Sequence, residues 1–99
     1  MPGSGTTQWR VRWTKDAAND LEQIFQHIIQ DNPAAARSVI RTIADGIGKL
    51  RVFPNLGRSG LVEGTREIVF PSLPYIAVYR VKENAVQILR VYRGAQDWP

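Results

Sequence analysis

The chain has 99 residues, no cysteine, 43% hydrophobic and 22% charged residues, which predicts one small globular domain and excludes disulfides and thiolate metal sites. Its net charge of +4 comes from ten arginines and three lysines, and indicates either an ordinary solvated surface or one that meets an acidic partner. It contains no apolar run near the ~18 residues of a membrane helix, and residues 1–7 do not resemble a signal peptide. We therefore expect a disordered lead-in over 1–7, a single domain over 8–99 and a cytoplasmic location.

The first half of the chain predicts a strand and two helices. Residues 8–13 alternate apolar and polar side chains, the period of a strand with one buried face. Thr14 can cap a helix whose apolar residues recur every three or four positions to about residue 30. Asn32 and Pro33 then supply the cap and first residue of a second helix.

Two glycines lie inside the second predicted helix. Gly46 and Gly48 each weaken this helix by roughly 1 kcal/mol relative to alanine. Because glycine has no side chain, we expect both positions to let another segment pack closely against the helix. Pro54 ends this helix.

The second half of the chain predicts a loop and three strands. Residues 55–65 are rich in turn formers and predict a loop. The runs 66–70, 75–81 and 85–93 predict strands joined by short hairpin connections. The order is then β-α-α-β-β-β, an α+β domain with a helical hairpin on one face of a mainly antiparallel sheet. The last two runs are apolar on both faces and indicate central strands.

Common catalytic signatures are absent. His27 is the only histidine and falls in the first predicted helix, where a surface or boundary role is the expectation. The sequence contains no phosphate-binding loop or dinucleotide motif, so we expect no cofactor. Glu63 and Glu67 have no histidine beside them in sequence, and no metal site is indicated.

The remaining candidate functional residues are arginines and tyrosines on the predicted strands. They are either target-binding residues or amphipathic residues whose stems cover the sheet. These residues are Arg66, Tyr75, Tyr79, Arg80, Arg90, Tyr92 and Arg93.

The order of elements and three segments resemble the RelE/ParE superfamily of toxins from type II toxin–antitoxin modules. The segments are PNLGRSGLVEGTREIVF, PYIAVYRV and VQILRVYRGAQDWP, and the resemblance covers residues 8–99. It implies a toxin of a plasmid-stabilisation module that arrests bacterial growth and is neutralised by a cognate antitoxin. Some members of this superfamily cleave mRNA in the ribosomal A site, whereas the ParE branch poisons DNA gyrase.

The sequence departs from the RNase pattern at three places. Glu67 and Val69 stand where RelE-type RNases place lysines, and Ile76 follows Tyr75 where they have an arginine. Arg93 stands where many related toxins have a histidine. Because arginine stays protonated, it stabilises negative charge but is a poor general base. The resemblance therefore favours ParE-like gyrase inhibition over a ribosome-dependent endoribonuclease, with a harmless RNA- or protein-binding module as a third alternative.

The resemblance also suggests the residues that would meet a target. Candidates for catalysis, if the chain is an RNase, are Arg66, Arg80, Tyr92 and Arg93. Candidates for target binding are Arg58, Arg66, Arg80, Arg90, Tyr92 and Arg93. Among these, Arg66 and Arg80 are the ones most expected to be structural, since a buried arginine needs carboxylate or carbonyl partners.

The partner is expected to be an antitoxin with an acidic toxin-binding segment. It would use an unpaired strand edge and the apolar groove where the helices meet the sheet. Residues Arg90–Arg93 are expected to gain protection from hydrogen exchange in that complex.

Overall fold

A computed structural model describes residues 8–94. The expected lead-in over 1–7, and the terminal Asp97, Trp98 and Pro99, lie outside the described residues. The elements in chain order are β1 Arg10–Trp13, α1 Lys15–Ile29, α2 Pro33–Gly48, the 3₁₀ helix η1 Lys49–Arg51, β2 Arg58–Ser59, β3 Arg66–Val69, β4 Tyr75–Lys82 and β5 Ala85–Arg93.

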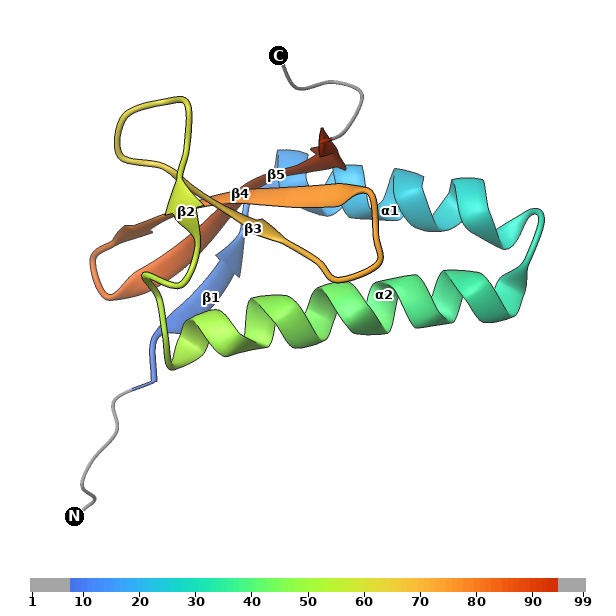
Figure 1. The fold of residues 1–99 in the computed structure, drawn as a ribbon, viewed down its shortest axis with the longest axis horizontal. Helices are drawn as coiled ribbons and strands as arrows, with labels where there is room; N and C mark the ends of the chain where they lie inside the picture. Colours follow the sequence, from blue (N-terminus) through green and yellow to red (C-terminus); the bar gives the residue numbers. More distant parts are fainter. Residues whose placement is uncertain (1–7, 95–99) are drawn as a thin grey trace.

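The strands form one mixed sheet in the order β1-β5-β4-β3-β2. β1 runs parallel to β5, and every other neighbouring pair is antiparallel. The antiparallel helical hairpin of α1 and α2 lies on one side of the sheet, and its tip extends beyond the sheet (Figure 1). The predicted α+β class, the succession of strand, two helices and then strands, and the helix-covered face are confirmed, and β4 and β5 are central strands as expected.

The predicted loop over 55–65 was wrong at one point, because it contains β2. Arg58 pairs with Glu67 and Ser59 with Arg66, which adds a fifth strand at the edge of the sheet. Gly60 N–H donates to the Thr65 carbonyl at 2.8 Å and closes the turn between β2 and β3. A strand of two residues is too short to show an alternating pattern, so the surrounding turn residues dominated the prediction.

Both helices begin at the predicted caps. Thr14 Oγ1 accepts a hydrogen bond from Ala17 N–H at 3.1 Å, and Asn32 Oδ1 accepts one from Ala35 N–H at 3.1 Å. Pro33 occupies the first turn of α2, where its missing N–H leaves no intrahelical bond unmade. Thr14 also ties α1 to the sheet, since its hydroxyl lies 2.9 Å from the Ile88 carbonyl.

The hydrophobic core lies between the helical hairpin and one face of the sheet. Its fully buried side chains include Ile43, Leu50, Phe70, Tyr79, Val86 and Ile88. Close packing is confirmed at Gly46, where an added Cβ would lie 2.8 Å from the Phe70 ring. The same expectation was wrong for Gly48, which has nothing within 4 Å of that position because it faces solvent. Within residues 8–94, neither helix combines the length and the apolar character needed to cross a bilayer.

Candidate target-binding site

Three different places in the fold hold the six residues that the sequence suggested for target binding. Arg58 and Arg80 point to the face of the sheet that the helices leave open, opposite the core-facing Ile68 and Tyr79. Arg66 is in register with Tyr79 and points to the helix-covered side. The other three, Arg90, Tyr92 and Arg93, lie at the end of β5, after an irregularity in its pairing with β4. A single site containing all six does not form.

Arg58 is held by the one buried charged side chain among the described residues. Its Nε lies 2.9 Å from Glu67 Oε1, with 55% of the arginine side chain exposed and 2% of the glutamate. The second carboxylate oxygen, Oε2, is buried without a hydrogen-bond partner in the structure. Glu67 therefore depends on Arg58 for its neutralisation, because a buried carboxylate is costly when it is unpaired.

Arg66 and Tyr79 fasten the segment that leads into β2. Arg66 Nη1 donates to the Gly57 carbonyl at 2.8 Å and to the Asn55 carbonyl at 3.4 Å. Tyr79 donates to the Pro54 carbonyl and accepts from Gly57 N–H, both at 2.8 Å, and burial raises the pKa of its hydroxyl. Gly57 permits this approach, since an added Cβ would lie 2.8 Å from the Tyr79 hydroxyl. Arg66 thus has the carbonyl partners that the sequence argument expected of a structural arginine.

Arg90 forms a bidentate ion pair with Asp20 of α1. Its Nε and Nη2 lie 2.7 Å and 3.1 Å from the two carboxylate oxygens of Asp20. The hydrogen bond to Asp20 is the main cause that raises the pKa of the Arg90 guanidinium. Asp20 Oδ2 also accepts from Val91 N–H at 3.0 Å. The outer edge of β5 is thus capped by α1 where β1 has ended.

A cleft lies between α1 and the last residues of β5, and we call it the α1–β5 cleft. It measures about 270 Å³ and is lined by Asp20, Gln23, Ile24, His27, Tyr75, Val91, Tyr92 and Arg93. The Arg93 guanidinium lies 5.9 Å from the centre of the Tyr75 ring, a cation–π distance.

His27 is exposed on α1, as expected, yet it lines this cleft with Tyr92 and Arg93. This proximity could not be predicted from sequence spacing, because α1 and β5 are far apart in the chain and come together only in the folded structure. No group of three or more potential metal ligands occurs within residues 8–94.

The open face of the sheet carries cations that the sequence argument did not single out. Arg10, Arg12 and Lys82 are exposed there, on the opposite side of their strands from the partly buried Val11, Trp13 and Val81, which pack against the core. The alternation in residues 8–13 already separated the arginines from the apolar side chains.

Comparison with known proteins places this arrangement in one family. The model of the "ParE toxin of type II toxin-antitoxin system, parDE" matches residues 11–98. A putative toxin, Y4kP, of Sinorhizobium fredii is 39% identical over 90 residues, which covers 91% of this chain and 93% of that protein.

Solved structures agree with the family match. The chromosomal ParDE system from P. aeruginosa is similar with a TM-score of 0.80 and 31% identity, covering 89% of this chain and 98% of that one. The RelBE2 toxin–antitoxin complex from Mycobacterium tuberculosis is similar with a TM-score of 0.58 and 25% identity, covering 87% and 98%. On the strength of the matched segment, the sequence identity and the shared fold, the chain belongs to the ParE toxin family of type II toxin–antitoxin systems.

Proposed function

We propose that this ParE-family toxin arrests bacterial growth by inhibiting DNA gyrase in the cytoplasm, and that a cognate antitoxin neutralises it. The observation that carries the choice of gyrase is the greater likeness to the ParDE system than to RelBE2, in both sequence identity and fold. Members of the wider superfamily share a fold and differ in activity, so the fold alone does not specify the target and the choice of gyrase rests on this likeness.

The chemistry of the described residues supports a binding role over a nucleolytic one. Arg66 is bonded to carbonyls and Arg90 to Asp20, and an arginine of either kind is a poor general base. The Tyr79 hydroxyl is already used in two hydrogen bonds, and its raised pKa makes it harder to ionise. These three residues have structural roles, and none of them is suited to act as the general base that RNA cleavage needs.

The test is a gyrase supercoiling assay with the purified full chain. We expect inhibition of supercoiling by the wild type and weaker inhibition by Arg93→Gln, which alters the α1–β5 cleft. Arg37→Gln changes an exposed charge on α2 that does not line this cleft, so it serves as the matched control and should inhibit like the wild type. Full supercoiling activity at a large excess of folded toxin would refute gyrase as the target.

A ribosome-dependent endoribonuclease is the second candidate, and one observation favours it. The α1–β5 cleft brings His27, the only histidine of the sequence, together with Tyr92 and Arg93, and histidine is the residue type most often used as a general acid or base. A translation-coupled mRNA cleavage assay addresses this candidate. Cleavage that is lost in His27→Gln, without gyrase inhibition, would establish the RNase and displace the gyrase proposal.

The antitoxin is proposed to dock along the exposed edge of β3. β2 covers only Arg66 and Glu67 of β3, so Ile68 and Val69 have no strand partner on that side within the described chain. A groove of about 360 Å³ follows this edge, with the exposed Leu56 and Val69 and the cations Lys49 and Arg58 along it. An extended antitoxin segment with alternating apolar and acidic residues would add a strand beside β3, and its acidic side chains would pair with these cations.

Hydrogen exchange measured on the toxin alone and in the antitoxin complex tests the docking. We expect increased protection at residues 68–70 and, from the sequence argument, also at Arg90–Arg93. Because Asp20 already caps Val91 N–H, the gain at β5 should be the smaller one. Unchanged exchange at both segments would show that the antitoxin binds elsewhere.

A further inference from the structure

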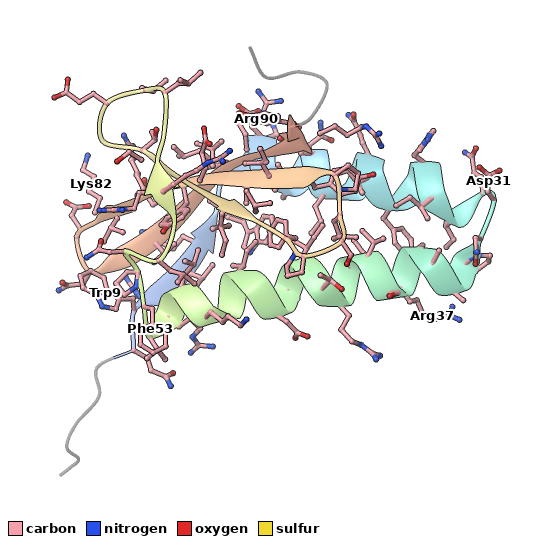
Figure 2. All side chains as sticks on the ribbon, in the orientation of Figure 1. Trp9, Asp31, Arg37, Phe53, Lys82 and Arg90 are labelled. Atoms are coloured by element: carbon pink, nitrogen blue, oxygen red, sulfur yellow. The ribbon has the colours of Figure 1, made fainter. Side chains whose placement is uncertain are left out.

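Four cations form a compact group on the open face of the sheet, and we call them the basic quartet. Its members are Arg10, Arg12, Arg80 and Lys82, and all are exposed. They come from the two strands that flank β5, with Arg10 and Arg12 on β1 and the other two on β4. Figure 2 shows Lys82 at the end of the sheet remote from the helical hairpin tip, where Asp31 lies.

The register of the sheet places these charges in two rows. Arg10 and Lys82 both pair with Ala85, one from each side of β5. Arg12 and Arg80 both pair with Gln87 in the same way. Since strands lie about 4.8 Å apart and alternate residues about 7 Å apart, the Cα atoms form a rectangle of roughly 10 by 7 Å.

Within residues 8–94, no acidic side chain forms an ion pair with a member of the quartet. Neither ion pair of the described residues involves any of its members. Arg80 Nε donates to Gln87 Oε1 at 2.9 Å, which orients the guanidinium without removing its charge. Glu83 follows Lys82 in the tight β4–β5 turn and is the nearest carboxylate in sequence, so the group keeps a net positive charge.

A closely spaced set of exposed guanidiniums is suited to oxyanions, above all to phosphate, which arginine binds with two parallel hydrogen bonds. The side chains between the cations are Ala85 and Gln87, and neither is aromatic. Surfaces that bind single-stranded nucleic acid stack its bases on aromatic side chains. The quartet lacks that platform and fits a phosphate backbone whose bases remain paired.

We propose that the basic quartet binds the phosphate backbone of duplex DNA. The choice of DNA rests on the proposed function, since an inhibitor of DNA gyrase acts beside duplex DNA. In this arrangement the toxin contacts the nucleic acid as well as the enzyme, through the face of the sheet opposite the helices. The contact is independent of base sequence, because phosphates carry none of that information directly.

Fluorescence anisotropy of a short labelled DNA duplex, titrated with the full chain over a range of salt concentrations, tests the proposal. If all four cations contact phosphates, log Kobs should fall with log salt with a slope of about −3.6. The double variant Arg12→Gln/Arg80→Gln should reduce the magnitude of that slope by about 1.8. Glu83→Gln, which removes the neighbouring negative charge, should tighten binding.

The matched control is Arg37→Gln/Arg41→Gln, which removes the same charge from exposed positions on α2. It should keep the wild-type slope, and circular dichroism should show that both double variants are folded. Equal losses in the two double variants, no measurable duplex binding by the wild type, or tighter binding of single-stranded DNA or duplex RNA would each overturn the proposal.

A parallel gyrase assay separates this proposal from the proposed function. Gyrase inhibition by a wild-type chain that does not bind DNA would remove the quartet proposal alone. Quartet-dependent DNA binding without gyrase inhibition would support the quartet and count against gyrase as the target.

Discussion

The two faces of the sheet carry different side chains for different physical reasons. On the covered face, Phe70, Val86 and Ile88 are at most 1% exposed against the helical hairpin, and the buried Tyr79 hydroxyl has partners for both of its hydrogen bonds. On the open face, arginines and a lysine extend into solvent over small or polar neighbours. The stability of the fold thus resides mainly in the covered face, which leaves the open face able to vary its charge.

The largest expected effect comes from a cavity in the covered face. Ile88 is fully buried in central strand β5, so Ile88→Ala should lower the free energy of unfolding by about 2–5 kcal/mol. Val69→Ala on the open face, where the side chain is 50% exposed, should change it by less than about 0.5 kcal/mol. Urea unfolding curves of both variants provide the measurement. Similar losses at the two sites would contradict the contrast between the faces.

The buried charge on the open face should give the next largest effect. Arg58→Gln leaves Glu67 buried without its cation and should cost about 1–3 kcal/mol. Glu67→Gln removes the buried charge while Arg58 stays largely in water, so it should cost less than about 1 kcal/mol. The two substitutions break the same ion pair but should lower the free energy of unfolding by different amounts. Denaturant unfolding of both variants measures this difference. Equal costs would show that Glu67 is solvated in ways that its burial does not indicate.

The hydrogen bonds of the buried Tyr79 hydroxyl on the covered face should contribute measurably to stability. Tyr79→Phe leaves the Gly57 N–H and the Pro54 carbonyl without their partner, and should cost about 1–2 kcal/mol. Tyr75→Phe is the matched control, since the residues that the structure describes form no hydrogen bond with the Tyr75 hydroxyl, and it should be nearly neutral.

The raised pKa of Tyr79 adds a pH dependence with a definite sign. Above about pH 10 the unfolded chain releases this proton while the folded chain retains it, so stability should fall as pH rises. Unfolding free energies measured across this range should fall less steeply in Tyr79→Phe than in the wild type. An identical slope in both would mean that other groups cause the alkaline loss.

The smallest expected difference concerns the two helix caps. Thr14→Ala removes the cap of α1 together with the bond to the Ile88 carbonyl, and should cost about 1–2 kcal/mol. Asn32→Ala removes only an exposed cap at the tip of the hairpin and should cost about 0.5–1 kcal/mol. Thermal unfolding of both variants tests the order. A larger loss at Asn32 would show that the tip matters more than the junction with the sheet.

Much of the fold could be predicted because its signals are local. The alternation in residues 8–13, the caps at Thr14 and Asn32, and the apolar stripes each specify an element within a few residues. β2 was missed because two residues cannot show a period. The parallel pairing of β1 with β5 has no local signature, since strand partners are chosen by the core they share.

The candidate site was predicted less well, because its geometry depends on contacts between distant segments. Arg90 meets Asp20 across a separation of 70 residues, and sequence spacing gave no indication of this pair. Arg66 could be anticipated as structural, because a cation on a core-facing strand position needs internal acceptors. The basic quartet required the register of three strands, which only the assembled sheet provides.

The pairing of β1 with β5 also sets when the protein can finish folding during its synthesis. β1 leaves the ribosome early, but Thr14 at its end bonds to Ile88, a residue 74 positions later. At about 5–20 residues per second, the first strand waits roughly 4–15 s for its partner to be made. A ribosome that stalls before residue 85 therefore releases a chain without the strand that joins β1 to the rest of the sheet. Interrupted translation should then produce fragments that cellular proteases remove, and no partly active toxin.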